Sequence, residues 1–390
     1  MSTSQLNPPA DDELEVSVFG PGYGESIVIH LGGGKWMLVD SCLDPNTGFP
    51  APTKYLADFK VDLASAVKMV VATHWHDDHI RGLSAVFRAC DSAQLVISKA
   101  LATNEFLSLA TLYSQRPFAE TTGVDEFVRV LRMLGERKKR GAQLSPPTYA
   151  VTDRVLHIDS LQLASLTVDI KVSALSPSDA SILKADLAFA QLMPRENLPK
   201  RRLVSPTPNH ASVVLWVEVG QHKILLGADL ENTADPMTGW SVILDEAKVI
   251  SGKASVFKIP HHGSENAHEN RVWSEILHPN PWAVVTPYRG GKKPLPSPTD
   301  VERIASLTNH AYATASARQQ KIRWGERVVR ELVKEVAREI HGVYAGWGHV
   351  RFRQKITDPA PNWQVELFGD AYPLSGAPKL PSPDTIPHRA

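Results

Sequence analysis

Residues 73–83 read THWHDDHIRGL, and this stretch decides the fold that the sequence predicts. Between positions 74 and 79 it holds three histidines and two aspartates. The run before it, VKMVVA at 67–72, is apolar and rich in β-branched residues, which predicts a buried strand. The polar residues therefore lie on the loop after a strand, where α/β proteins place binding and catalytic groups.

Imidazoles and carboxylates gathered in this way are suitable ligands for a metal ion such as zinc. Histidines also cluster by chance, and an isolated His-x-His pair carries little weight. The pattern HxHxDH directly after a predicted strand is much narrower, so we favour a metal site over a chance cluster. For Asp77, the spare acid of the pattern, one hypothesis is a part in proton transfer, but we favour an exposed or turn-forming residue.

Predicted strands and helices surround this stretch. Strands are expected at 14–19, 26–31, 35–39 and 94–98, and helices at 53–60 and 80–89. An order of strand, loop, helix and strand predicts an α/β fold in which helices cover a sheet. The glycine-rich segment 20–26 leads into no helix and lacks a closing Lys-Ser/Thr, so we expect a strand-to-strand turn near the site rather than a phosphate-binding loop.

The rest of the chain predicts a similar mixture. Helices are expected at 124–134, 178–191, 240–249, 272–277, 299–307 and 326–340. Strands are expected at 166–175, 211–219, 222–226, 255–259, 282–286, 349–352 and 364–367. Residues 1–12 and the proline-rich tail 371–390 are expected to be disordered.

The charge balance argues against a global attraction to nucleic acid. The 390 residues include 42 Lys and Arg and 42 Asp and Glu, so the formal net charge is zero. Only local basic runs, at 136–140, 200–202 and 289–293, are available to contact phosphates. We interpret the run 136–140 as a solvated helix end, because cations are favourable at that pole of a helix.

The sequence also predicts a cytoplasmic protein. Its two cysteines, Cys42 and Cys90, make no disulfide framework and suit a reducing compartment. The N-terminus has neither the basic nor the apolar part of a signal peptide. No apolar run approaches the roughly 18 residues that a membrane span requires.

Four further polar positions border predicted strands. They are Asp40, the pair Asn209 and His210, Asp229, and the pair His261 and His262. Each carries a group that binds a metal ion or orients a ligand. With its HxHxDH motif and this order of acid, histidines, aspartate and histidine, the sequence resembles the metallo-β-lactamase superfamily of metal-dependent hydrolases.

Four ordered motifs are similar to the metallo-β-lactamase domain of ComEC-type DNA-uptake proteins. They are FGPGYGES at 19–26, NHASVVL at 209–215, GAD at 227–229 and HHGS at 261–264. The resemblance spans about residues 14–300 and implies an α/β fold, an αββα sandwich of two mixed sheets flanked by helices. We expect a single domain over 13–370, with a helical insertion at about 100–205 and an extra C-terminal segment at about 310–370.

The resemblance also implies two adjacent divalent metal ions, with Zn²⁺ expected and Mn²⁺ as the alternative. His74 and His76 would hold the first ion, and His210 is either a third ligand or a neighbour. Asp78 and His79 would hold the second ion with one histidine of the pair at 261 and 262. The carboxylate of Asp229 would bridge the two ions. The carboxylate of Asp40 would accept a hydrogen bond from a ligand imidazole.

Two divalent ions about 4 Å apart lower the pKa of a shared water, and the resulting hydroxide attacks phosphorus or a carbonyl carbon. We therefore assign catalytic roles to Asp78 and Asp229 through the ions that they hold. No GxSxG nucleophile motif is present. Weaker candidates for contact with substrate or with the ligands are Asn209, Ser264, Lys200, Arg201 and Arg202.

The leading hypothesis is a metal-dependent hydrolase of phosphodiester bonds, nuclease-like, with an anionic substrate that includes nucleic acid among its candidates. A second hypothesis is hydrolysis of a small ester, lactone or phosphoryl-choline-like compound, which would need no basic patch. A third is a non-catalytic metal-binding sensor on the same fold. The complete HxHxDH motif and Asp229 argue against the third hypothesis, because a sensor does not need a full set of ligands.

Overall fold

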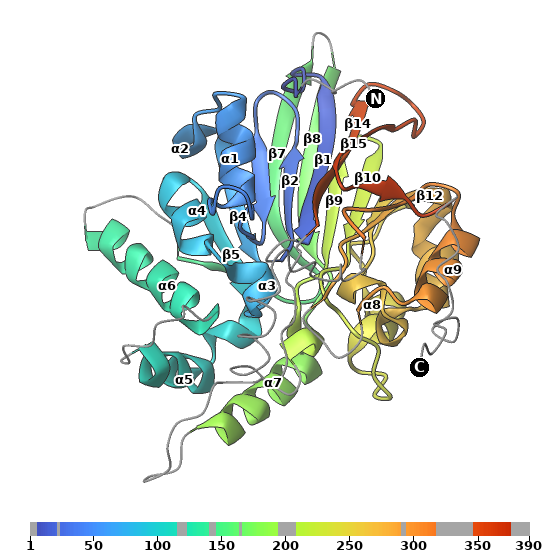
Figure 1. The fold of residues 1–390 in the computed structure, drawn as a ribbon. Coiled ribbons are helices and arrows are strands. Elements are labelled where there is room, and N and C mark those ends of the chain that lie inside the picture. The colour runs from blue at the N-terminus through green and yellow to red at the C-terminus, as the bar shows by residue number, and fades with distance from the viewer. Residues whose placement is uncertain are drawn as a thin grey trace, which may run out of the picture.

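The computed structural model describes residues 6–21, 24–114, 123–139, 146–163, 166–193, 208–289, 294–316 and 346–375. In this part of the chain, two eight-stranded mixed sheets pack face to face, and helices cover their outer faces (Figure 1). This is the αββα sandwich that the sequence predicted.

The first sheet contains the strands that lead to the HxHxDH loop. In spatial order it runs β15-β14-β1-β2-β3-β4-β5-β6. Its strands are β1 (Glu13–Pro21), β2 (Ser26–His30), β3 (Trp36–Val39), β4 (Val67–Ala72), β5 (Gln94–Ser98), β6 (Thr148–Ala150), β14 (Trp347–Lys355) and β15 (Gln364–Gly369). Pairing is antiparallel from β15 to β3 and parallel from β3 to β6.

The second sheet also combines parallel and antiparallel pairings, and its edge strand β16 pairs antiparallel with β13. In spatial order it runs β16-β13-β12-β11-β10-β9-β8-β7. Its strands are β7 (Arg154–Leu163), β8 (Leu166–Ala174), β9 (Leu215–Val219), β10 (His222–Leu226), β11 (Ala254–Lys258), β12 (Leu277–Val285), β13 (Ala311–Ala313) and β16 (Tyr372–Pro373). Its central strands β10, β11, β12 and β13 are mutually parallel.

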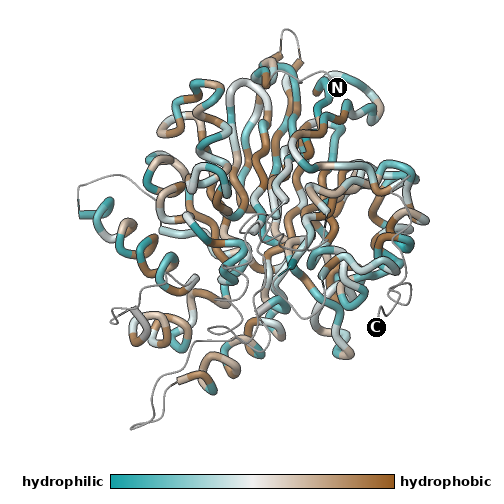
Figure 2. Tube along the Cα trace, in the orientation of Figure 1, coloured by the Kyte–Doolittle hydropathy of each residue, from teal (hydrophilic) through white to brown (hydrophobic). Residues whose placement is uncertain are grey.

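Both faces of the central strands are apolar, because each face packs on a core. In β2, Ile27 and Ile29 point to the core between the sheets, whereas Val28 packs in the layer under the helices. Val71 and Val70 of β4 divide in the same way. The central strands therefore read as continuous apolar runs, and Figure 2 shows hydrophobic (brown) segments along them.

The helices lie on the outer faces and at the sheet ends. They are α1 (Ala51–Asp58), α2 (Leu63–Ala66), α3 (Asp77–Ile80), α4 (Leu83–Ala89), α5 (Asn104–Ser114), α6 (Gly123–Lys139), α7 (Asp179–Leu192), α8 (Gly239–Glu246) and α9 (Pro298–Leu307). Glu126 of α6 accepts a hydrogen bond from the backbone N–H of Ser84 at the start of α4 (2.9 Å). This contact ties the helical layer to the segment that follows the HxHxDH loop.

The helix expected over residues 80–89 is divided. α3 ends at Ile80 and α4 begins at Leu83, and Gly82 between them has a φ of +81°. Such a backbone conformation favours glycine and breaks a helix. The break separates the one-turn helix α3, which carries Asp78 and His79, from the helix that packs in the outer layer.

Two other segments differ from the sequence prediction. Within the stretch 100–205, expected as a helical insertion, α5, α6 and α7 are helical, but residues 148–174 contribute β6, β7 and β8 to the two sheets. Of these three strands, only β8 was predicted, as the strand at 166–175. The helix expected at 272–277 is a single π-helical turn, Val272–Ile276, and β12 begins at Leu277 rather than at 282. Polar residues hid β7, and prolines hid the first half of β12, from a search for apolar runs.

Parts of both chain ends that were expected to be disordered are described by the structure. Residues 6–12 are described, and Asp12 forms an ion pair with Lys355 of β14 (2.6 Å). The tail expected from 371 begins with β16, which pairs with β13. The helix predicted at 326–340 and residues 376–390 lie outside the described residues. None of the helices that the structure describes is both long and apolar enough to cross a membrane.

The glycine-rich turn after β1 lies against the HxHxDH loop, as expected. The backbone N–H of Glu25 donates to the carbonyl oxygen of Asp78 (2.8 Å). Gly24 has a φ of +133°, and a Cβ at this position would lie 1.8 Å from the same oxygen. Only glycine allows this approach of the two backbones.

We expect Gly24→Ala to destabilise the protein more than Gly34→Ala. Both glycines have positive φ, but a Cβ on Gly34 meets nothing within 4 Å. The control should therefore cost only the backbone strain, about 1–2 kcal/mol. Gly24→Ala should lower the free energy of unfolding by about 1–3 kcal/mol more, as overpacking does. Urea unfolding of both variants tests this, and equal losses would contradict the close approach.

Candidate metal centre

The candidate site lies where the parallel strands of both sheets end. Asp40 follows β3, and the HxHxDH loop follows β4, its parallel neighbour. In the second sheet, Asp229 comes three residues after β10, and His262 comes four residues after the parallel strand β11. Parallel strands present their carboxyl ends at one edge, so each sheet contributes two neighbouring loops. The packing of the sheets then brings the four loops together.

One group of possible ligands consists of Asp78, His79, Asp229 and His262, and its ligand atoms all lie within 4.8 Å of one another. His262 Nε2 is 3.3 Å from Asp78 Oδ2 and 3.5 Å from Asp229 Oδ2. His79 Nε2 is 3.3 Å from Asp229 Oδ1. With bonds of about 2.0–2.2 Å, the ligand atoms of a tetrahedral zinc ion are roughly 3.3–3.6 Å apart. These three separations match that spacing.

A second group consists of His74, His76 and Asp229. His74 Nε2 lies 3.2 Å from His76 Nδ1 and 3.9 Å from Asp229 Oδ2. Asp229 belongs to both groups, which is the arrangement expected of a bridging carboxylate. The two groups differ in size, because the first offers four ligands and the second three.

The ligand imidazoles are anchored through their second nitrogens. His79 Nδ1 lies 2.8 Å from Asp40 Oδ2, and His262 Nδ1 lies 2.8 Å from the backbone oxygen of Thr286. Each acceptor places the proton on Nδ1 and leaves Nε2 free for a metal ion. His79 Nε2 and Asp229 Oδ1 are buried and have no hydrogen-bond partner. Since such atoms are costly to bury alone, this donor set fits a divalent ion.

Asp40 occupies the position that the sequence predicted for it, beside a ligand histidine. Besides His79, its carboxylate accepts hydrogen bonds from the backbone N–H of Thr73 (2.8 Å) and from Thr73 Oγ1 (2.7 Å). Thr73 Oγ1 also lies 3.0 Å from His74 Nδ1. One buried carboxylate thus orients residues that belong to both ligand groups.

The charges of the site are strongly coupled. Burial alone would lower the pKa of His79, but the carboxylates of Asp229, Glu25 and Asp78 outweigh burial and raise this pKa well above its usual value. Burial alone would raise the pKa of Asp229, but His79 and His262 hold it well below its usual value. The carboxylates thus favour positive charge among them, and a bound divalent ion would supply it without protons on the imidazoles.

Strained backbone is concentrated at the site. Asp40, Ala228, His261 and His262 all have positive φ, between 43° and 58°. Residues other than glycine rarely adopt this conformation, and it persists where surrounding contacts impose it. At Asp40 and His262 it accompanies the hydrogen bonds that direct the side chains toward the ligand groups.

His261 and His210 lie outside both ligand groups and face Glu231. His261 Nδ1 is 3.3 Å from Glu231 Oε1 and 3.0 Å from Asn266 Oδ1. His210 Nε2 is 4.0 Å from Glu231 Oε2. Asn209 joins the same cluster through Nδ2, which lies 2.6 Å from Glu231 Oε1 and 3.3 Å from His261 Nε2. Of the two alternatives left open for the pair 261 and 262, the structure places His262 with the possible ligands.

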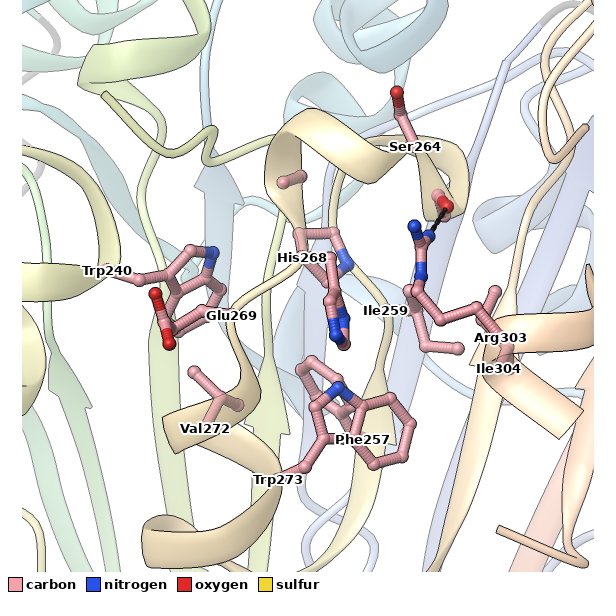
Figure 3. A pocket seen from close by; sticks show the side chains of 13 residues that line it. Trp240, Phe257, Ile259, Ser264, His268, Glu269, Val272, Trp273, Arg303 and Ile304 are labelled. Carbon is pink, nitrogen blue, oxygen red and sulfur yellow. Dashed lines mark hydrogen bonds between the residues drawn. The ribbon is translucent and has the colours of Figure 1, made fainter. Parts of the chain in front are cut away.

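Ser264 lines a small cavity behind the His261–Gly263 turn (Figure 3). Its hydroxyl points away from the aromatic rings, and Arg303 donates a hydrogen bond to the backbone oxygen of Gly263 (2.6 Å). The cavity measures about 10 Å³, which is room for roughly one water molecule. It is too small to admit a substrate. Lys200, Arg201 and Arg202 lie outside the described residues.

The sequence prediction missed three polar residues at the site. Glu231 stands two positions after Asp229, and its place in the motif GADLE was the only available signal. Glu25 was visible as the acid of the glycine-rich turn but had no role. Lys258 ends the apolar strand β11 and is fully buried, which no local pattern indicates.

We expect divalent ions to stabilise the protein through Asp78. An ion at 100 times its Kd should add about 2.7 kcal/mol to the free energy of unfolding. Asp78→Asn should lose most of this gain, because it removes a charged ligand. Asp77→Asn is the control, since Asp77 is outside both groups and Asn can still accept from the Gly123 N–H. Thermal unfolding with Zn²⁺, with Mn²⁺ and with a chelator gives the comparison, and equal responses would contradict the assignment.

Metal content should separate the roles of His210, His261 and His262. His262→Ala should lower the ions retained after dialysis by one per chain, because it removes a ligand of the four-residue group. His261→Ala and His210→Ala should retain the content of the unmodified protein. Elemental analysis measures this. Loss of an ion in His210→Ala would show that this side chain turns from Glu231 to complete the three-residue group.

Comparison with known proteins gives a family. The sequence profile of the metallo-beta-lactamase superfamily matches residues 19–272. No curated protein matches the sequence significantly. Among solved structures, MEM-A1, a subclass B3 metallo-beta-lactamase from a soil metagenome library, is 13% identical, with a TM-score of 0.32 over 69% of this chain and 84% of that one.

Two other solved structures show similar values. The metallo-beta-lactamase fold protein YhfI from Bacillus subtilis is 14% identical, with a TM-score of 0.31 over 63% of this chain and 71% of that one. Zn(2+)-bound PqqB from Methylobacterium extorquens is 12% identical, with a TM-score of 0.28 over 60% of this chain and 58% of that one. Because the profile match spans more than half of the sequence and includes the HxHxDH loop and Asp229, this chain belongs to the metallo-beta-lactamase superfamily.

Proposed function

We propose that this protein is a hydrolase that uses two divalent metal ions, Zn²⁺ or Mn²⁺, to cleave phosphodiester bonds. The observation that carries the proposal is the pair of ligand groups that share the buried carboxylate of Asp229. The superfamily generally consists of hydrolases, which supports the reaction class. The phosphodiester substrate is supported by the motifs at 19–26, 209–215, 227–229 and 261–264, which are similar to those of ComEC-type domains.

When bound, such ions neutralise charge that develops on the scissile group and acidify a water molecule. His74, His76 and Asp229 would hold one ion, and Asp78, His79, Asp229 and His262 the other. The part of Asp40 is to keep the proton of His79 on Nδ1, so that Nε2 points to the ion. The backbone oxygen of Thr286 plays the same role for His262, because it accepts the proton on Nδ1 and leaves Nε2 free.

The cluster around Glu231 is the best placed polar group to contact a substrate. Glu231, His261 and His210 are each about one-fifth exposed, whereas the ligands His79 and Asp229 are almost fully buried. Asn209 donates to His261 Nε2, so the proton of His261 lies on Nδ1, which faces Asn266 Oδ1. The exposed rim therefore consists of imidazoles and a carboxylate.

That carboxylate favours a second candidate, hydrolysis of a small ester, lactone or phosphoryl-choline-like compound. Glu231 repels a polyanion, and the formal net charge of the chain is zero, so no global field attracts nucleic acid. A small substrate with a hydroxyl or cationic group could instead interact favourably with the Glu231 carboxylate. A non-catalytic sensor is less well supported, because both ligand groups are present.

The proposed location of the protein is the cytoplasm. Its two cysteines, Cys42 and Cys90, are unpaired, which suits a reducing compartment.

A substrate panel with the metal-reconstituted protein tests the proposal. We expect hydrolysis of bis-p-nitrophenyl phosphate that a chelator abolishes and that Zn²⁺ or Mn²⁺ restores. Asp229→Asn should lower kcat by at least about 100-fold, since it removes the ligand common to both ions. Asp77→Asn is again the control and should stay within about twofold of the unmodified protein.

The panel also separates the candidates. Activity confined to p-nitrophenyl esters or lactones would move the assignment to the second candidate. A protein that binds the ions tightly but cleaves no phosphodiester, ester or lactone would favour the sensor. Failure to bind any divalent ion would overturn both hydrolase candidates.

A further inference from the structure

A buried ion pair joins the two sheets directly beside the metal centre. Lys258 is the last residue of β11, Glu25 immediately precedes β2, and both are at most 1% exposed. Lys258 Nζ lies 2.7 Å from Glu25 Oε1. Removing two such charges from water is costly, and an apolar pair of the same volume is often as stable or more so. A role in stability alone therefore does not account for this pair.

Glu25 and Lys258 are each connected by a hydrogen bond to the backbone of a different metal-ligand segment. Glu25 belongs to the first sheet, and its backbone N–H donates to the carbonyl oxygen of Asp78 (2.8 Å). Lys258 belongs to the second sheet, and its Nζ donates to the carbonyl oxygen of Ala228 (3.3 Å), the residue before Asp229. The pair thus connects the backbone that carries Asp78 with the backbone that carries Asp229.

The same carbonyl of Ala228 holds the histidine turn. It accepts a second hydrogen bond from the backbone N–H of His261 (3.0 Å), the residue before His262. Through this one oxygen, Lys258 is connected to both ligands that the second sheet supplies to the four-residue group. The other two ligands, Asp78 and His79, come from the first sheet.

Lys258 also determines which carboxylate orients His79. Glu25 Oε1 lies 3.9 Å from His79 Nδ1, whereas Asp40 Oδ2 lies 2.8 Å from it. Glu25 is held by the ammonium group of Lys258, and its other oxygen, Oε2, is buried without a hydrogen-bond partner. If Lys258 were absent, Glu25 would compete with Asp40 for the same N–H.

We propose that Glu25 and Lys258 are positioning residues that set the separation of the ligands contributed by the two sheets, and thereby the affinity of the four-ligand site for a divalent cation. This inference rests on the proposed metal-dependent function. It assigns to neither residue a contact with substrate or with the ion of the four-ligand site. Lys258 acts through the carbonyl oxygen of Ala228, whereas Glu25 acts through the backbone of Asp78 and through the position of its carboxylate beside His79 Nδ1.

The test is the double variant Glu25→Gln with Lys258→Met, which removes both charges and keeps the side-chain volumes close. The probe is Co²⁺ added to chelator-treated protein, followed by its visible absorption. We expect the double variant to unfold at nearly the same temperature as the unmodified protein. One of the two Co²⁺ equivalents should bind at least tenfold more weakly, with an altered absorption spectrum.

A matched control is the ion pair of Glu15 and Arg353, which joins β1 to β14 and has the same 2.7 Å separation. Glu15 is buried, and the side chain of Arg353 is 12% exposed. Neither residue belongs to a ligand group or to the Glu231 cluster. Glu15→Gln with Arg353→Met should leave Co²⁺ affinity and spectrum unchanged, whatever it does to the unfolding temperature. Equal losses of affinity in both double variants would overturn a positioning role, because they would show a general effect of a lost ion pair.

The single variant Glu25→Gln provides a second test in case the double variant does not fold. The amide oxygen of the new side chain can still accept from Lys258, but it lacks the charge that holds the ammonium group, so Co²⁺ should bind at least threefold more weakly. Unchanged Co²⁺ affinity and spectrum in a folded variant would overturn the inference. If the unmodified protein itself bound no Co²⁺, the proposed function would fail as well. The two failures are thus distinguishable.

Discussion

The carboxylate of Asp229 is the group on which the site depends, because Asp229 belongs both to the group with Asp78, His79 and His262 and to the group with His74 and His76. It is almost fully buried and is approached by His74, His79 and His262. A buried carboxylate without compensating charge would be protonated or would destabilise the fold. The sandwich tolerates it because the first sheet supplies the imidazoles of His74 and His79 and the second sheet supplies that of His262, and because the surrounding groups could hold divalent cations.

This requirement explains the topology around the site. Each sheet contains a set of parallel strands beside its antiparallel ones, β3 to β6 in one and β10 to β13 in the other. Parallel strands bring the ends of neighbouring strands to one edge, so polar loops gather there while the strands stay apolar. The chain departs from its apolar pattern at Glu25 and Lys258, and these two residues also form the ion pair that spans the sheets beside Asp78 and Asp229.

Much of this could be predicted from the sequence. Strands with both faces buried appear as continuous apolar runs, so β3, β4 and β10 were evident, and their ends marked Asp40, His74 and Asp229. Strands with a mixed pattern, such as β7, were missed because their exposed residues break the apolar run. Long-range pairing is absent from local patterns, so nothing indicated that Lys258 would meet Glu25, more than 200 residues earlier in the chain.

By itself, the sequence determined which chemical groups are available and which loops carry them, because residue type and strand periodicity are local properties. Only the tertiary structure decided how neighbours such as His261 and His262 divide between Glu231 and the metal ligands. Both have positive φ, so the alternation of a strand does not apply to them, and the choice depends on acceptors supplied from elsewhere in the fold. His262 meets the carbonyl of Thr286, and His261 meets Asn266 and Glu231. The HxHxDH motif is half of a metal centre, and the packing of the second sheet supplies the rest.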